Sequence, residues 1–256
     1  MTTIASAAEP TLLRLSTVSV AFGGLIALGG IDLDVAQGER LAVLGPNGAG
    51  KTTLFNVVAG DIRPTSGSVW IRGVDSTMLP SRRRPSLGVA RTYQRTRLFP
   101  GLTVEDNLYL ALVGRHGRHR SIRRSQVDEQ WRSRARDAAR SVWLGDRLES
   151  SVGDLSHGQQ RQLEVGMAVV TEPDLMMLDE PASGLSRGER ERLVELLDSL
   201  AADVTLLLIE HDMDVALRVA RRVVVMADGK TIAAGTPDEI RASQLVHDVY
   251  LGSRSH

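Results

Sequence analysis

The chain has 256 residues, of which 42% are hydrophobic and 24% are charged, values that are ordinary for a globular protein with a sizeable core. Its 31 basic and 31 acidic side chains give a formal net charge of zero, which argues against bulk electrostatic attraction to nucleic acid. Cysteine is absent, which excludes disulfides and thiolate chemistry.

The N-terminal residues 1–10 contain neither a basic opening nor a continuous apolar stretch, so they predict a loose tail rather than a secretory signal. Nowhere do about 18 apolar residues run together, and the most apolar run, 206–209, suits a buried strand. We therefore expect any connection to a membrane to pass through another polypeptide.

In the first part of the chain, β-branched or leucine-rich runs alternate with helical patterns, which favours a largely parallel sheet flanked by helices. Two alternating runs at the front predict antiparallel strands. The next strand leads into a glycine-rich loop and then into a helix that ends at Gly60. The predicted strands cover 12–20, 31–35, 40–44, 68–74 and 89–93, the predicted helix covers 51–59, and a surface turn is expected at Arg82, Arg83 and Arg84.

Residues 103–148 have a helical and strongly basic pattern, which predicts a second subdomain. Its arginine cluster lies in a connection that contains glycine and serine. Basic side chains at an anionic membrane surface each add about 1 kcal/mol, but that field decays over about 8 Å in physiological salt, so a solvated loop is the favoured interpretation. The cluster consists of Arg115, Arg118, Arg120, Arg123 and Arg124.

After that subdomain the pattern returns to alternating strands and helices. The helix starts at Ser186 and Thr236 carry capping boxes with Glu189 and Glu239, and Pro237 occupies the first helical position of the second. Strands are predicted at 175–178, 204–209 and 222–226, with one helix from 186 and another that ends at 220.

The loop at 45–52 fits the pattern G-x-x-x-x-G-K-[ST], in which glycines let backbone N–H groups wrap phosphates at a helix N-terminus. Lys51 would reach the β- and γ-phosphates of a nucleotide, and the Thr52 hydroxyl would hold Mg²⁺. An ordinary glycine turn is the alternative, but a chance match in a chain of this length is about one per cent. The predicted nucleotide-binding residues are Gly45, Pro46, Asn47, Gly48, Ala49, Gly50, Lys51, Thr52 and Thr53.

A second pattern is the apolar run 175–178, which is followed by Asp179 and Glu180. A strand that is apolar at consecutive positions is covered on both faces, and it delivers the two carboxylates to the sheet edge where the loop also lies. Asp179 is then suited to a Mg²⁺-bound water, and Glu180 to orienting or deprotonating the water that attacks ATP. For an acidic pair taken alone, two solvated strand caps are the alternative.

The third pattern is the segment Leu-Ser-His-Gly-Gln at 155–159. Ser156 and Gly158 start a helix whose later face is apolar at helical spacing. We expect the N-terminus of this helix to be open and to suit phosphate. A plain serine N-cap is the alternative when the segment is taken alone.

Together, the loop, the acidic pair and this segment resemble the ATP-binding cassette (ABC) family over residues 12–252. The resemblance implies an α/β fold: a P-loop NTPase (RecA-like) core with a mainly parallel sheet, an antiparallel β subdomain and a helical subdomain. We expect one cassette domain over 11–252, with the core at about 11–95 and 172–252 and the helical subdomain at about 96–171. The resemblance also implies that one copy cannot complete its own active site, because Ser156, Gly158 and Gln159 reach ATP held by a second subunit.

The resemblance assigns further positions. Gln94 corresponds to the glutamine that contacts Mg²⁺ and the γ-phosphate, His211 to the switch histidine at the γ-phosphate, and Phe22 to the aromatic residue that stacks on adenine. Taken without the resemblance, the three residues have structural alternatives: a surface polar residue, a structural histidine and a core phenylalanine, respectively. Residues 181–185 resemble the D-loop, which crosses the dimer interface, and an exposed turn is their alternative.

One residue departs from the family pattern. The more familiar signature has glycine where this chain has His157. Gly158 is the position whose missing Cβ matters for close approach to phosphate. We therefore expect the activity to tolerate the histidine.

Within the family, the segments 22–25, 98–107, 210–213, 235–240 and 249–252 resemble branched-chain amino acid importers. A similar subgroup with a Ser-His-Gly-Gln signature handles urea or short amides, and lipopolysaccharide-export ATPases share much of the same C-terminus. A soluble ABC ATPase of repair, cluster assembly or translation is the alternative from another class. Such proteins usually carry two cassettes or a long coiled coil.

The resemblance thus implies an ATPase that uses ATP and Mg²⁺ to energise import of branched-chain amino acids or related small polar solutes. The expected partners are a second cassette subunit, in a homodimer or a heterodimer, and transmembrane permease subunits. An extracytoplasmic solute-binding protein is an indirect partner, and no nucleic acid is expected. The expected location is cytoplasmic and peripheral on the inner face of the cell membrane.

Overall fold

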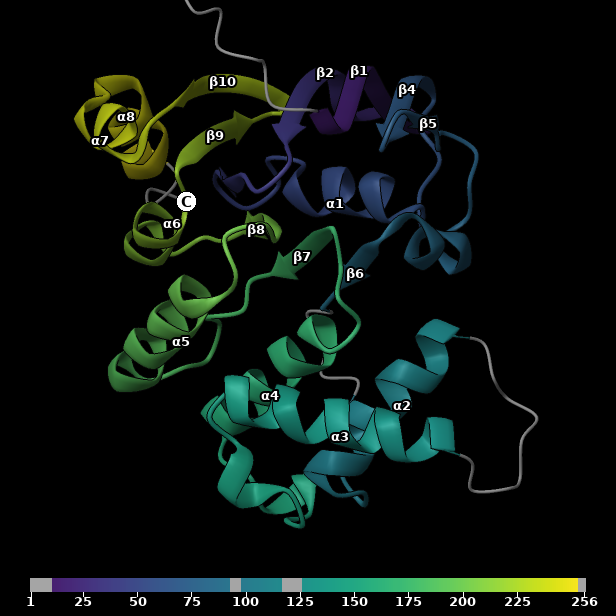
Figure 1. Ribbon diagram of the computed structural model, residues 1–256. Helices are drawn as coiled ribbons and strands as arrows, with labels where there is room; N and C mark the ends of the chain where they lie inside the picture. The colour runs from purple at the N-terminus through teal and green to yellow at the C-terminus, as the bar shows by residue number, and fades with distance from the viewer. Residues whose placement is uncertain (1–10, 93–97, 117–125, 253–256) are drawn as a thin grey trace, which may run out of the picture.

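The structure, a computed structural model, describes residues 11–92, 98–116 and 126–252. Figure 1 shows a small sheet at one end of the molecule, a larger sheet with its helices in the middle, and a separate layer of helices at the other end. Among the described residues, no helix has both the length and the apolar character that crossing a membrane requires.

The small sheet has the strand order β2-β1-β4-β5, and its neighbouring strands are antiparallel. This confirms the antiparallel pair predicted at the front of the chain. The strand predicted over 68–74 is wrong at its end, because Arg72 and Gly73 have φ values of 53° and 72° and turn the chain between two strands. The strands are β1 (Thr11–Phe22), β2 (Leu25–Ala36), β4 (Ser66–Ile71) and β5 (Val74–Asp75).

The large sheet has the order β10-β9-β3-β8-β7-β6, with parallel pairing everywhere except between β9 and β10. Every residue of β7 and β8 is buried, as expected for parallel strands covered on both faces. The antiparallel edge strand β10 was not predicted. The strands are β3 (Arg40–Leu44), β6 (Val89–Arg91), β7 (Leu175–Asp179), β8 (Thr205–Ile209), β9 (Arg222–Ala227) and β10 (Lys230–Gly235).

Helix α1 (Lys51–Ala59) lies between the two sheets (Figure 1). Its Leu54, Phe55 and Val58 belong to a core cluster that also contains residues of β1 and one face of the large sheet. It ends at Gly60, whose φ of 79° is the left-handed cap predicted from the sequence. The loop before α1 is therefore held between two sheets, which fixes its place at the carboxyl end of β3.

The other face of the large sheet packs against the remaining core helices. Capping boxes begin two of these helices at Ser186 and Thr236, and Pro237 is the first helical residue of the second, as predicted. The helices are α5 (Arg187–Ser199), α6 (Met213–Val219), α7 (Pro237–Ala242) and α8 (Gln244–Gly252).

Three helices that lie between β6 and β7 in the sequence form the separate layer in Figure 1. They are α2 (Val104–His116), α3 (Gln126–Ser141) and α4 (His157–Val169). Leu108, Leu112 and Leu163 are fully buried among them. The helical subdomain is therefore present between the two parts of the core, and its limits at residues 96 and 171 stay predictions. Of the arginine cluster, only Arg115 belongs to the described residues.

The predicted surface turn at 82–84 is wrong for its last residue. The three arginines lie in a 3₁₀ helix, Ser81–Leu87, and Arg84 is only 2% exposed. Its guanidinium donates to the carbonyl of Ser76 at 2.7 Å, and burial lowers the pKa of Arg84 to about 10. A Cβ on Gly60 would lie 2.7 Å from Arg84 Nε, so the side chain fills the space beside the cap of α1. Charge alone predicted exposure, and long-range packing overrides it.

Candidate nucleotide site

The loop 45–50 follows β3 and leads into α1, the strand, loop and helix order that the sequence predicted. Gly45, Gly48 and Gly50 have φ values of 150°, 81° and 95°. At Gly45 a Cβ would lie 2.2 Å from the carbonyl oxygen of Met226, so no larger residue fits there without a shift. Gly50 is the N-cap of α1 and provides no side-chain cap, and the first turn holds no acidic residue. The N-terminus of α1 is therefore suited to an anion.

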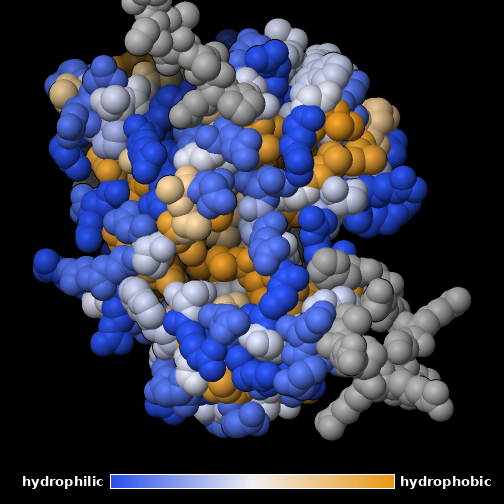
Figure 2. Space-filling model, in the orientation of Figure 1, coloured by the Kyte–Doolittle hydropathy of each residue, from blue (hydrophilic) through white to orange (hydrophobic). Residues whose placement is uncertain are grey.

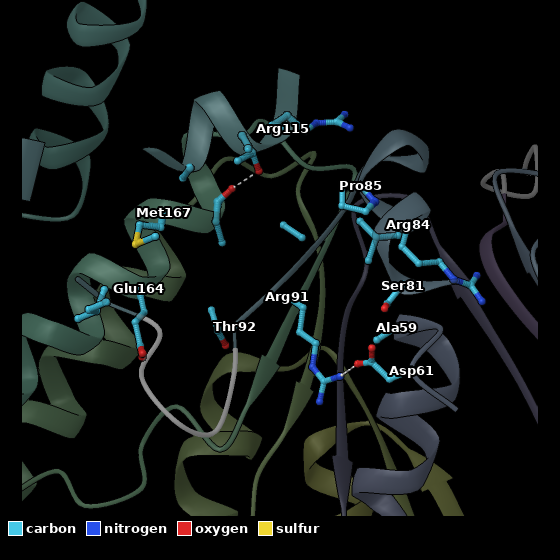
Figure 3. Close-up of a pocket in the computed structure, with 17 residues that line it drawn as sticks. Ala59, Asp61, Ser81, Arg84, Pro85, Arg91, Thr92, Arg115, Glu164 and Met167 are labelled. Carbon is cyan, nitrogen blue, oxygen red and sulfur yellow. Dashed lines mark hydrogen bonds and ion pairs between the residues drawn. The ribbon is translucent and has the colours of Figure 1, made fainter. Parts of the chain in front are cut away.

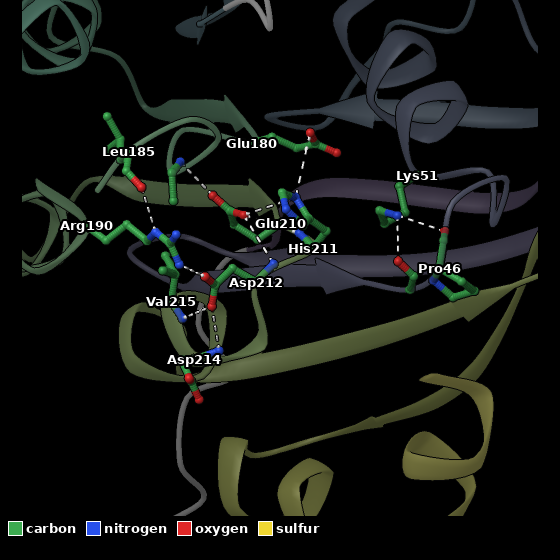
Figure 4. Close-up of polar contacts among 12 residues, drawn as sticks. Pro46, Lys51, Glu180, Leu185, Arg190, Glu210, His211, Asp212, Asp214 and Val215 are labelled. Carbon is green, nitrogen blue, oxygen red and sulfur yellow. Dashed lines mark hydrogen bonds and ion pairs between the residues drawn. The ribbon is translucent and has the colours of Figure 1, made fainter. Parts of the chain in front are cut away.

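Lys51 is the first residue of α1 and is 6% exposed. Its Nζ donates to the carbonyl oxygens of Gly45 and Pro46, at 2.6 and 3.0 Å, so the ammonium lies along the loop (Figure 4). Burial lowers the pKa of Lys51, and the negative charges of Glu180 and then Asp179 oppose that shift. These three groups thus share one electrostatic environment although they come from opposite halves of the sequence.

Asp179 is the last residue of β7 and is 2% exposed. Burial raises the pKa of its carboxyl group. The Arg91 guanidinium lies 3.4 Å from the carboxylate, and its positive charge opposes this shift. Arg91 also bonds Asp61 and Asn56, at 2.7 and 2.8 Å, and thereby connects the end of β6 to the loop after α1 and to α1 itself. This arginine was not among the predicted site residues.

The oxygen donors present fit Mg²⁺. The Asp179 carboxylate is a hard donor, and the Thr52 hydroxyl is exposed at the start of α1. The described residues contain no group of three or more His, Cys, Asp or Glu side chains that would hold a metal by themselves. Mg²⁺ is commonly bound through one or two carboxylates together with water and substrate phosphates, so such a cluster is not required.

Glu180 directly follows β7 and has a φ of 47°, in the left-handed region that a side chain with a Cβ rarely adopts. Its backbone N–H donates to Ile209 at 2.9 Å, so the neighbouring strand β8 holds the strained residue in place. The Glu180 carboxylate lies 3.8 Å from Nδ1 of His211, a contact drawn in Figure 4. Backbone strain of this kind concentrates at functional sites.

His211 is positioned by Glu210, a fully buried carboxylate at the end of β8. Glu210 accepts hydrogen bonds from the backbone N–H groups of Ala182, His211 and Asp212, at 2.8, 3.2 and 3.5 Å. Burial raises the pKa of Glu210, and these N–H groups oppose the shift. Glu210 therefore links the segment after Glu180 to the histidine. A charged residue directly after four buried apolar ones was the sequence signal for it.

The predicted D-loop, 181–185, has a second connection to the segment that carries His211, in addition to the one through Glu210. Arg190 on α5 donates to the carbonyl of Leu185 at 3.0 Å and forms an ion pair with Asp212 at 2.8 Å. Asp212 in turn caps α6, because it accepts from the N–H groups of Asp214 and Val215. Figure 4 shows this chain of contacts beside the Glu180–His211 pair. The segments after β7 and β8 are thus fixed relative to each other.

The start of α4 differs from the prediction of an open helix end. Ser156 is the N-cap and forms a capping box with Gln159. The N–H of Gly158 donates to Oε1 of Glu189 at 3.0 Å, and a Cβ on Gly158 would lie 2.7 Å from the same atom. A side chain at 158 would therefore displace the Glu189 carboxylate from this contact. The Glu189 pKa is lowered by its bonds to Ser186 and then to Gly158.

His157 also faces the chain's own D-loop. Its Nε2 lies 3.2 Å from the position that a Cβ would take on Gly184, whose φ is 76°. The histidine therefore contributes a side chain to the contact between the start of α4 and the D-loop.

The remaining predicted positions fall into two groups. Phe22 is 51% exposed at the end of β1, which excludes the core alternative, and Gln94 lies outside the described residues.

A cavity of about 330 Å³ lies between the core and the helical layer (Figure 3). It is lined from the core by Val89, Ala90 and Thr92, and from α2 and α4 by Ala111 and Met167. In the view of Figure 2, apolar side chains gather in the band between the sheet and the helical layer. Thr92 directly precedes the segment 93–97, which contains Gln94 and lies outside the described residues.

Comparison with known proteins decides the family. The family model "ABC transporter" matches residues 28–183, which is more than half of the chain. The chain belongs to the ABC transporter family. A second model, "Branched-chain amino acid ATP-binding cassette transporter", matches 230–256. The chain is thus an ABC ATPase of the branched-chain amino acid type, which confirms the family and subgroup predicted from the sequence.

Two relatives match along nearly their whole lengths. The high-affinity branched-chain amino acid transport ATP-binding protein LivG of Salmonella typhimurium is 37% identical over 253 residues, which cover 94% of this chain and 98% of LivG. The corresponding protein BraF of Pseudomonas aeruginosa is 37% identical over 255 residues with the same coverage. Both carry the name of the solute class that the sequence pattern predicted.

Solved structures confirm the predicted fold. The ADP conformation of MJ1267, an ATP-binding cassette of an ABC transporter, has a TM-score of 0.84 and 27% identity, covering 95% of this chain and 100% of that one. A dimeric structure of the cassette MJ0796, bound to ADP and phosphate, has a TM-score of 0.74 and 24% identity over 88% of this chain and 99% of that one, and it is similar in fold. The ABC cassette architecture therefore extends over almost the whole chain.

Proposed function

We propose that the chain energises import of branched-chain amino acids by hydrolysing ATP with Mg²⁺ at the P-loop, Asp179 and Glu180. The observation that carries this proposal is that the parallel strands β3 and β7 end at the same edge of the sheet, where Val43 and Asp179 both pair with Ile209 of β8, so that the P-loop lies beside Asp179 and Glu180. LivG and BraF, which are named for transport of these amino acids, support the solute class. Urea or short amides are the alternative solutes.

Each residue has a defined part in the proposed reaction. The backbone N–H groups at the start of α1 and the Lys51 ammonium bind the phosphates. Thr52, Asp179 and Gln94 would hold Mg²⁺, which when bound would supply positive charge to offset the charge that develops on the phosphates. Glu180 orients the attacking water and accepts its proton. His211, next to Glu180, contacts the γ-phosphate.

Two cassettes are proposed to close head to tail over two ATP molecules. In that arrangement Ser156, Gly158 and Gln159 of one chain approach the γ-phosphate bound by the other, and Phe22 stacks on the adenine. In Figure 1, α1 lies beside the small sheet and α4 lies in the separate helical layer, which supports a site completed by a second copy. The dimeric cassette MJ0796 gives a precedent of the same fold.

The chain is proposed to act in the cytoplasm, bound to the inner face of the membrane through permease subunits. The cavity between the core and the helical layer is the proposed contact, with a short apolar segment of the permease as its occupant. Two observations support this assignment: apolar side chains of both layers line it, and Thr92 at its edge leads into the segment of Gln94. A solute-binding protein outside the membrane would act through the permease.

Reconstitution tests this proposal. The chain and the permeases that co-purify with it are inserted into proteoliposomes with a solute-binding protein, and phosphate release from ATP is measured. Binding protein loaded with leucine, isoleucine or valine is expected to stimulate hydrolysis, whereas urea and short amides are not. Stimulation by urea or an amide alone would assign the other solute class, and failure to co-purify with any permease would contradict transport.

A Met167→Arg variant tests the permease contact. The added charge enters the apolar part of the cavity from α4, which contributes no residue to the P-loop, so permease co-purification is expected to be lost while ATP affinity is retained. Normal co-purification of this variant would exclude the cavity as the contact.

A further inference from the structure

The first residue of the P-loop is bonded to the last helix of the described chain. The N–H of Gly45 donates to Oη of Tyr250 at 2.9 Å, across a sequence separation of 205 residues. Tyr250 lies near the end of α8, in the segment 230–256 that matches the branched-chain amino acid model rather than the general one. No residue of α8 was predicted to touch the nucleotide site.

Gly45 needs such a partner because of where its backbone lies. The residue is buried, and its missing Cβ would meet the carbonyl oxygen of Met226 at 2.2 Å. In this loop conformation the peptide lies against the end of β9, and its N–H does not reach solvent. A buried N–H group without an acceptor is strongly unfavourable, so the Tyr250 hydroxyl stabilises the conformation in which the loop is held.

The orientation of Tyr250 is fixed by the packing of its helix. Val246, one helical turn earlier, is fully buried in the main core cluster, and Tyr250 lies on the same face because residues four apart share a side of a helix. Burial raises the pKa of Tyr250, while its bond to Gly45 opposes that shift. The phenol therefore stays neutral at physiological pH and its oxygen accepts the N–H.

A second contact joins the C-terminal segment to the other end of the loop. Gly229, in the turn between β9 and β10, donates its N–H to the carbonyl of Ala49 at 3.1 Å. A Cβ on Gly50 would lie 3.4 Å from the Cα of Gly229. Residues 226–250 therefore contact the P-loop at its first residue and again just before α1.

We propose that Tyr250 is a positioning residue of the nucleotide site: by accepting the Gly45 N–H, it holds the P-loop in its phosphate-binding conformation, so that α8 and a bound nucleotide stabilise each other. This rests on the proposed role of the P-loop as the ATP site. Tyr250 does not touch the phosphates. It acts through the backbone of Gly45.

The Tyr250→Phe variant tests the proposal, because it removes the oxygen and keeps the ring that packs against the core. Without nucleotide, the loop relaxes to satisfy the N–H, and binding then has to reverse that relaxation. The dissociation constants of ATP and ADP are expected to rise about fivefold or more, the scale of a buried N–H that loses its acceptor. The thermal midpoint without nucleotide is expected to stay close to that of the wild type.

Tyr109→Phe is the matched control. Tyr109 Oη is hydrogen-bonded to Asp128 at 3.0 Å in the helical layer, so this variant removes an equivalent bond far from the loop. Its nucleotide affinity is expected to equal that of the wild type. A purely structural role of Tyr250 would instead lower the nucleotide-free midpoint and leave both dissociation constants unchanged, which would overturn the proposal.

Hydrogen exchange gives a readout that packing alone does not move. Since coupling between two sites is reciprocal, ADP is expected to slow amide exchange across α8 in the wild type and much less in Tyr250→Phe. Amide exchange in α8 of the wild type that is equally fast with and without ADP would overturn the proposal. If the wild type binds ATP and Tyr250→Phe binds it equally well, only this inference fails. If the wild type does not bind ATP at all, the proposed function fails with it.

Discussion

Two helices of this chain begin at residues that the family pattern associates with phosphate, and their N-termini are built differently. Helix α1 starts after Gly50, with no side-chain cap and no acidic residue in its first turn. Helix α4 starts after Ser156, whose side chain caps the helix by accepting the Gln159 N–H, and the Gly158 N–H donates to Glu189. The N-terminus of α1 is therefore suited to an anion, while the N-terminus of α4 is already bonded to a carboxylate of its own chain.

The difference shows how the chain separates two tasks. The end of α1 has Lys51, Asp179 and Glu180 around it and is proposed to bind the chain's own nucleotide. The end of α4 has the Glu189 carboxylate, which a phosphate from a second copy would have to displace, since like charges repel. Glu189 also caps α5 directly after the D-loop, so the start of α4 and the D-loop are connected within one chain.

The largest effect is expected at the α1 side from Glu180→Gln. Removing the general base lowers hydrolysis by about 10²–10⁴-fold, while the phosphate-binding groups stay unchanged and ATP affinity is retained. Single-turnover hydrolysis and equilibrium binding measure the two quantities. Glu195→Gln on α5 is the control and should be normal in both. Near-normal turnover in Glu180→Gln would remove Glu180 from the mechanism.

Lys51→Ala is expected to act on binding. The loss of a charge-assisted contact to phosphate weakens ATP affinity by about tenfold to 100-fold. Lys230, the only other lysine, is exposed on β10 and supplies the matched control, since Lys230→Ala should bind ATP normally. Equal affinities in the two variants, measured by titration with a fluorescent ATP analogue, would contradict the assignment of the P-loop.

On the α4 side, Gly158→Ala and His157→Ala sharpen the comparison. The new Cβ at 158 would lie 2.7 Å from Glu189 Oε1 and displaces it. That Cβ also occupies the space in which a phosphate of the second copy would approach the Gly158 backbone, so steady-state ATPase activity should fall strongly in Gly158→Ala. His157→Ala should keep most of it. Equal tolerance of both changes would contradict the role given to Gly158.

The smallest effect is a pH dependence of stability through Glu189. Its pKa in the folded protein is lowered by Ser186 and Gly158, so its stabilising contribution is present above its unfolded pKa and is lost as pH falls through the folded value. The thermal midpoint of the wild type should exceed that of Glu189→Gln at neutral pH. The gap should close between about pH 5 and pH 3. A gap that persists in acid would contradict this assignment.

The features that the sequence predicted well are local. The P-loop, the capping boxes at Ser186 and Thr236, and the buried strand before Asp179 each depend on a few consecutive residues. Family resemblance added the roles of His211, Ser156 and Phe22, which no local pattern determines. These roles stay predictions.

The features that the sequence did not predict depend on distant contacts. Glu189 meets Gly158 across 31 residues, and Tyr250 meets Gly45 across 205. The burial of Arg84 depends on the space beside Gly60, and no charge pattern contains that information. The turn at Arg72 and Gly73 was missed because apolar residues lie on both sides of it, at Ile71 and Val74.

The central claim is that the α1 end of one chain and the α4 end of another form a single ATP site. Sedimentation of the Glu180→Gln chain, which binds ATP without consuming it, tests this most directly. With ATP the chain is expected to sediment as a dimer with two bound nucleotides, with ADP as a monomer, and with Gly158→Ala added as a monomer that still binds ATP. A Glu180→Gln chain that stays monomeric with its ATP site filled would contradict the claim.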